Sequence, residues 1–91
     1  MKVKVYAWTV WVNYAGVFKH FVSNSRYEAN MKAWRYYRDT VEQCKEDGTL
    51  DFWEEDEEIK NIVTFCKHKN TYIPTTEGIV YFEFNEYEFE Y

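Results

Sequence analysis

A run of five consecutive carboxylates is the strongest chemical signal in this sequence, and Trp53 comes directly before it: Glu54, Glu55, Asp56, Glu57 and Glu58. Five like charges repel one another, so the run costs stability unless a cationic group approaches it. Such a surface can mimic the phosphate repeat of a nucleic acid and occupy the Lys/Arg groove of a nucleic-acid-binding protein. The alternative is a solvated helix face, compensated by the helix N-terminus and by nearby lysines.

A second group of carboxylates alternates with aromatic residues near the end of the sequence, where Glu86, Glu88 and Glu90 are interleaved with Tyr87 and Phe89. Alternate residues of a strand share one face, so these three acids form a ladder. If the ladder and the acidic run lie on the same side, they make one surface. We therefore predict a partner-binding site at the following residues: Trp53, Glu54, Glu55, Asp56, Glu57, Glu58, Glu86, Glu88 and Glu90.

Charge is distributed unevenly along the chain, whose formal net charge is -5. Residues 1–45 contain eight Lys or Arg and three acids, which gives +5. Residues 46–91 contain three Lys and thirteen acids, which gives -10. Such asymmetry indicates either internal complementarity between the two halves or a charged face for a partner.

Cysteine and histidine suggest two further chemistries, a zinc site and a thiol nucleophile. Zinc ligands usually come in pairs with about two to four residues between them. Cys66 and His68 are too close together for this, and Cys44 has no nearby mate. Cys44 is also expected late in a helix, where the negative end of the helix dipole disfavours a thiolate nucleophile. With only isolated glycines and no phosphate loop, we expect no catalytic residue, no metal and no cofactor, and so no enzyme.

The cellular setting follows from the same residues. Two cysteines without a disulfide framework are typical of a reducing compartment, so we expect thiols in a cytoplasmic protein. Strand-like sequence directly after Met1 argues against a targeting leader. No run of about 18 apolar residues is present to span a membrane.

One long helix, Ser25–Asp47, is the clearest element of secondary structure. Ser25 and Glu28 have the spacing of a reciprocal capping box, and Gly48 supplies a left-handed terminator. Apolar residues recur at helical period and predict the buried stripe: Tyr27, Met31, Trp34, Tyr37, Val41 and Cys44.

Strands are expected on both sides of this helix. Lys2–Val12 reads as a strand that is apolar on both faces, and a turn at Asn13–Gly16 returns the chain as Val17–Val22. Ile79–Phe84 is a further strand, and the apolar phase changes after Asn85, which predicts a bulge or a tight turn there.

The stretch Asp51–Lys67 is harder to assign, because its run Ile62–Phe65 favours a strand by residue propensity. Its apolar residues fall on one side at helical period, with acids at the start and Lys and His at the end, so we predict a second helix over Asp51–Lys67. Asn70–Gly78 contains the only proline and is predicted to be a loop. These elements give a single α+β domain over 1–91, of order β-β-α-α-β(-β), with an antiparallel sheet and helices mainly on one face.

A small, acidic, aromatic-rich α+β chain with the run Glu54–Glu58 and an acidic strand ending at Tyr91 resembles small phage-encoded anti-defence proteins, namely anti-CRISPR and anti-restriction proteins of the DNA-mimic type. The resemblance is one of composition and charge placement over 51–91, without an alignable motif, so it transfers no functional residue. It implies a non-enzymatic, stoichiometric inhibitor in the host cytoplasm. Its partner would be a basic protein, a nucleic-acid-processing complex, bound through acidic contacts and aromatic anchors such as Trp53.

Two other functions remain open. The polarised charge and the strand apolar on both faces favour a self-associating module, possible as a homodimer. Direct binding of single-stranded nucleic acid would use Lys2, Lys4 and Lys19 with stacking on Tyr6 or Trp8. The overall acidity opposes this third function, because long-range repulsion slows the approach of a nucleic acid, and we expect no direct nucleic-acid binding.

Overall fold

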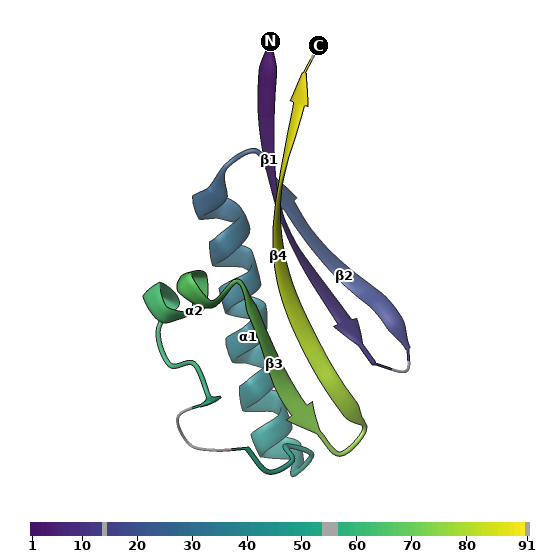
Figure 1. Cartoon of the computed structure of the whole chain (residues 1–91). Coiled ribbons are helices and arrows are strands. Elements are labelled where there is room, and N and C mark those ends of the chain that lie inside the picture. The colour runs from purple at the N-terminus through teal and green to yellow at the C-terminus, as the bar shows by residue number, and fades with distance from the viewer. Residues whose placement is uncertain (14, 54–56, 91) are drawn as a thin grey trace.

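The computed structural model describes residues 1–13, 15–53 and 57–90 of the chain. Within these ranges the strands form one antiparallel sheet of order β2-β1-β4-β3 (Figure 1). The expected α+β class and element order are confirmed, and the elements are β1 (Lys2–Val12), β2 (Gly16–Ser23), α1 (Arg26–Asp47), α2 (Ile62–His68), β3 (Asn70–Thr75) and β4 (Gly78–Glu90).

Helix α1 begins and ends where the sequence places it. The Ser25 hydroxyl accepts a hydrogen bond from the Glu28 backbone N–H at 3.2 Å, and Gly48 closes the helix in the left-handed region at φ 71°. The reciprocal half of the capping box is absent in the described residues, because the Ser25 N–H donates to the Ser23 hydroxyl at 3.0 Å. The Glu28 carboxylate instead accepts from that same Ser23 hydroxyl at 3.3 Å.

The buried line of α1 differs from the predicted stripe. The fully buried residues are Ala29, Ala33, Tyr37 and Val41, whereas Tyr27 is 74% exposed. The reason lies in the sheet, which sends bulky aromatic side chains toward the helix, Trp8 and Phe82 among them. Small residues on the helix leave the space that these rings fill.

The predicted helix over Asp51–Lys67 is wrong for its first half. Helix α2 is confined to Ile62–His68, and Asn61 caps it by accepting from the Thr64 N–H at 2.9 Å. The described residues between 51 and 61 form a connecting segment instead. A helix here would bring like-charged carboxylates close together, which is unfavourable. In the non-helical conformation, Ile59 is buried against the core.

The predicted loop at Asn70–Gly78 is largely a strand, β3, with a short turn before β4. Proline has no backbone N–H to donate to a neighbouring strand. Pro74 is nevertheless accommodated, because β3 is an edge strand and the sheet loses no hydrogen bond there. Its carbonyl accepts from the Asp51 N–H at 2.9 Å, so the chain after α1 lies along this edge.

The predicted bulge near Asn85 is also wrong. Strand β4 pairs with β1 without interruption from Val12↔Val80 to Lys2↔Glu90. The register shift of the sheet lies elsewhere, between Val10 and Trp11 on the β2 side of β1. The apolar residues of β4 therefore change phase because the surroundings of each face of the strand change along its length, and not because the strand is interrupted.

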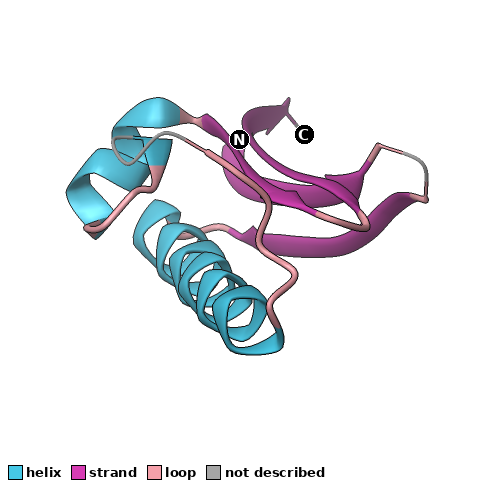
Figure 2. Ribbon diagram, turned by 90° about the horizontal axis from the view of Figure 1, so that it is seen from below, coloured by secondary structure: helices cyan, strands magenta, loops and turns pink. Residues whose placement is uncertain are grey.

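Both helices pack on the same face of the sheet, and Figure 2 shows α1 on that side. Phe65 of α2 stacks on Trp8 with ring centroids 4.5 Å apart and meets Phe82 edge-on at 6.3 Å. The core lies between this face and the helices. Neither helix of the described ranges is long and apolar enough to cross a membrane.

Candidate functional site

The acidic ladder of β4 lies on the helix side of the sheet and is largely paired with cations of this same chain. Glu88 forms an ion pair with Lys2 at 3.4 Å. Glu86 contacts both Arg26 and Lys4, the latter at 3.9 Å, and the hydrogen bond from Arg26 lowers the pKa of Glu86 below its ordinary value. Glu90 is exposed and lies opposite Lys2 in the register.

These contacts account for part of the charge asymmetry of the sequence. Antiparallel pairing of β1 with β4 places the lysines at the start of the chain against the glutamates near residue 90. Of the two explanations left open by the sequence, internal complementarity applies to this end of the molecule. Glu86 and Glu88 consequently contribute little free negative charge.

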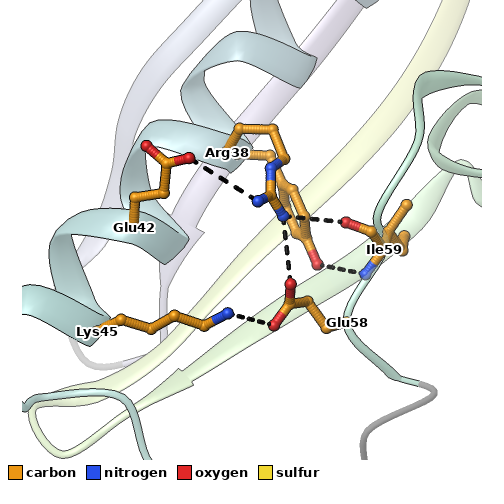
Figure 3. Close-up of polar contacts among 6 residues, drawn as sticks. Arg38, Glu42, Lys45, Glu58 and Ile59 are labelled. Carbon is orange, nitrogen blue, oxygen red and sulfur yellow. Dashed lines mark hydrogen bonds and ion pairs between the residues drawn. The ribbon is translucent and has the colours of Figure 1, made fainter.

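Glu58 is held against α1 and is almost buried, with its side chain 10% exposed (Figure 3). Its carboxylate lies 3.3 Å from Arg38 and 2.8 Å from Lys45. Arg38 also donates to the Ile59 carbonyl at 3.4 Å. Burial alone would raise the pKa of Glu58, but hydrogen bonds and charge from Lys45 and Arg38 outweigh it and leave the pKa lowered.

The remaining residues of the predicted site lie near β3. Trp53 is half-buried and meets Tyr72 edge-on, with ring centroids 6.3 Å apart. Tyr72 donates its hydroxyl hydrogen to Glu57 at 2.6 Å. Of the remaining predicted residues, Glu54, Glu55 and Asp56 lie outside the described residues.

The predicted site residues therefore fall into two separate groups. The ladder meets α1 at Arg26, and Glu58 meets it at Arg38, about 18 Å further along the helix axis at 1.5 Å per residue. The single acidic surface that would join both groups is not what the described residues form.

The structure brings together other acids at the end of the molecule where α1 finishes, and we name them the acidic pole: Glu46, Asp47, Asp51 and Glu77, all exposed. The Thr76 N–H donates to the Thr49 carbonyl at 2.8 Å, and Leu50 bridges to Thr75, so the turn before β4 lies beside the end of α1. Phe52, next to this pole, is 81% exposed. Glu77 could not be predicted from the sequence, because only the tertiary fold brings its turn beside the end of α1.

A second surface lies on the side of the sheet away from the helices, and we name it the open sheet face. Strand alternation and register assign its residues: Val3, Val5, Ala7, Thr9 and Trp11 of β1, His20 and Val22 of β2, Asn70, Tyr72 and Pro74 of β3, and Ile79, Tyr81, Glu83, Asn85, Tyr87 and Phe89 of β4. At the edge of this face, Tyr72 is also covered by its contacts with Trp53 and Glu57. Trp11 stacks on Tyr81 with centroids 4.3 Å apart. Val22, Tyr87 and Phe89 are each about half exposed, at 54%, 49% and 54%. The sequence signal for this face was the strand apolar on both sides.

A polar hollow of about 630 Å³ lies between the segment 57–61, α2 and β3, and Glu57, His68 and Tyr72 are among its lining residues. The chemistry there opposes catalysis by Tyr72, since its hydrogen bond to Glu57 raises the pKa of the phenol. Burial likewise raises the pKa of the Cys66 thiol, which disfavours a nucleophilic thiolate. In the described ranges no group of three or more His, Cys, Asp or Glu is placed to hold a metal ion.

The groups required for nucleic-acid stacking are engaged within the chain. Trp8 is fully buried, and Tyr6 lies beneath the Arg26 guanidinium at 5.2 Å from the ring centroid. Lys19 lies over the ring of Tyr36 at 5.5 Å. The described residues thus present no lysine beside an exposed aromatic face at the positions the sequence suggested.

No protein-family model, no curated protein and no solved structure matches this chain.

Proposed function

We propose that this chain is a non-enzymatic protein-binding protein and that its main binding surface is the open sheet face. One observation carries the proposal: a sheet face rich in aromatic and β-branched side chains is left bare by both helices. Among the residues assigned to this face, Glu83 is the one carboxylate, and none is Lys or Arg. Exposed apolar surface that carries few charges is typical of the centre of protein interfaces.

The first experiment compares two matched substitutions. Val22→Lys places a charge on the open sheet face, whereas Val63→Lys places it on α2 at a side chain of similar exposure, 54% against 62%. We expect Val22→Lys to reduce binding by about tenfold or more, because the ammonium must be desolvated within an apolar contact. Immobilised variants exposed to tagged wild-type chain and to native-host lysate would measure it.

In that experiment the bound species are quantified by mass spectrometry, and each variant is checked by far-UV circular dichroism. Val63→Lys should retain the binding of the wild-type chain. Equal binding by both variants would contradict the assignment of this face.

The acidic pole with exposed Phe52 supports a second candidate function, inhibition of a basic partner. Phe52, rather than the half-buried Trp53, is the aromatic side chain available as an anchor. Trp53 and Glu58, which stand on either side of Glu54–Asp56 in the sequence, contact Tyr72 and Arg38 respectively. In this function the chain acts in the cytoplasm as an anti-defence inhibitor, occupying the basic groove of a nucleic-acid-processing complex.

A matched pair of charge reversals tests this second function. Glu77→Lys alters the acidic pole, and Glu90→Lys alters the ladder at the opposite end of β4, with both side chains exposed. We expect Glu77→Lys to weaken capture of a basic complex at low salt by about tenfold, because two units of charge change at the contact. Glu90→Lys should leave capture unchanged. The reverse order would assign binding to the ladder instead.

A further inference from the structure

The ends of the two central strands form a ribbon that extends beyond the rest of the sheet. Pairing of β2 with β1 stops at Tyr6↔Ser23, and pairing of β3 with β4 stops at Asn70↔Glu83. Residues 2–5 and 86–90 continue as two strands alone, and in Figure 1 they project past the start of α1 with both termini. A two-stranded ribbon is at best marginally stable in water without packing on one face.

The two faces of this ribbon have different chemistry. On the helix side, Lys2 and Arg26 pair with Glu88 and Glu86. The other face carries the apolar set Val3, Val5, Tyr87 and Phe89. This set continues the open sheet face, and a polar row of His20, Thr9 and Glu83 separates it from the stacked pair Trp11 and Tyr81.

The charges decide how a second molecule can approach. Edge-to-edge pairing of two β4 strands about a twofold axis would place Glu86, Glu88 and Glu90 against their own copies. The same pairing of β1 edges would oppose lysines to lysines, and like charges directly opposite each other are destabilising. The open sheet face carries fewer charges than either edge, because Glu83 is its one carboxylate among the assigned residues.

We infer that the occupant of the open sheet face is a second copy of this chain, packed face to face about a twofold axis. The inference rests on the proposed function of that face. Two identical sheets have the same twist, and sheets of equal twist pack in the aligned manner of a β-sandwich. A twofold contact uses the same patch on both molecules, which suits a face that is apolar and nearly uncharged.

The area of the face is sufficient for a stable contact. Strands β1 and β4 have 11 and 13 residues, which at about 3.3 Å per residue gives lengths of about 36–43 Å. With the shorter outer strands, each copy offers about 600 Å² at a strand spacing of about 4.8 Å. Two copies would bury about 1,200 Å², the lower end of the range for specific protein interfaces.

Net charge predicts an unusual salt dependence for this dimer. Each copy carries a formal charge of -5, so the two molecules repel one another at long range while their contact is apolar. Added salt screens the repulsion and leaves the apolar contact intact. The dimer should therefore tighten with salt, whereas a dimer held by complementary charges would dissociate.

Sedimentation of the full chain at micromolar concentration, in low and high salt, tests the inference with a matched pair of variants. Tyr87→Lys places a charge on the open sheet face. Tyr27→Lys is the control, because it makes the same substitution at an exposed tyrosine of α1. We expect a wild-type dimer that Tyr87→Lys weakens by about tenfold or more, although that substitution reduces the net negative charge. Tyr27→Lys should remain as dimeric as the wild type.

A wild-type chain that stays monomeric in both salts would overturn the second copy as occupant. Loss of a different captured protein by Val22→Lys would then still uphold the proposed function, so the two failures are distinguishable. A dimer that dissociates in high salt, or that resists Tyr87→Lys, would also overturn the inference. Phe89→Ser at a 54% exposed side chain repeats the test without adding charge, in case Tyr87→Lys perturbs folding.

Discussion

Replacing Trp8 by alanine should lower the free energy of unfolding by about 3–5 kcal/mol. The side chain is fully buried, and its indole stacks on Phe65 of α2 and contacts Phe84 at a centroid distance of 5.4 Å. Its Nε1–H donates to the side-chain oxygen of Asn30 in α1 at 2.8 Å. One residue therefore joins the sheet to both helices, and its loss leaves a cavity at their junction.

Urea denaturation followed by circular dichroism would measure this loss, with two comparisons. Trp8→Phe keeps most of the apolar contact and removes the hydrogen bond to Asn30, so we expect a smaller cost of about 1–2 kcal/mol. Trp53→Ala is the matched control, because the same substitution there affects a half-buried ring. A cost for Trp8→Ala no greater than that for Trp53→Ala would contradict the described core.

Helix α1 could be predicted because its signals are local. A serine three residues before Glu28 and a glycine after Asp47 act within one turn of the helix ends. The buried line within the helix was less predictable. Whether Tyr27 or Ala29 faces the core depends on the size of the side chains that the sheet sends across, and no local pattern contains that information.

The errors in the last third of the chain have a common physical cause, which is non-local pairing. Strand β3 exists because Asn70–Thr75 finds β4, and a proline at an edge does not prevent this. On β4, the helix-side face is apolar at Phe84 and acidic at Glu86, because beyond that point the strand meets Arg26 and the lysines of β1 instead of the core.

The candidate surfaces show the same division. The open sheet face was signalled by the two-sided apolar pattern of Lys2–Val12, although the pattern alone could not say which face the helices cover. The acidic residues are conspicuous in the sequence, but the sequence does not show whether they are free to bind a partner. Glu58, Glu86 and Glu88 were chosen as partner contacts, and each has a cationic partner within the chain.

Acidification should remove a specific part of the stability, the contribution of Glu58. The pKa of this carboxyl is lowered in the folded protein from an ordinary value of 4.5. A lowered folded pKa means stability that is fully present above pH 4.5 and is lost as the pH falls through the folded value. Glu58→Gln should cost about 1.5–3 kcal/mol near neutral pH, because two charge-assisted hydrogen bonds are weakened beside Arg38 and Lys45.

The informative quantity is the difference between wild type and Glu58→Gln across the pH range, since Glu28 and Glu86 also have lowered pKa values and add to the acid sensitivity of both proteins. That difference should shrink toward zero below the folded pKa, where the protonated wild-type carboxyl resembles the amide. Glu42→Gln is the control, because that carboxylate is 69% exposed and lies 3.9 Å from Arg38. It should change stability by no more than about 0.5 kcal/mol. A constant difference for Glu58→Gln at every pH would show that packing, and not charge, holds the segment before α2 against α1.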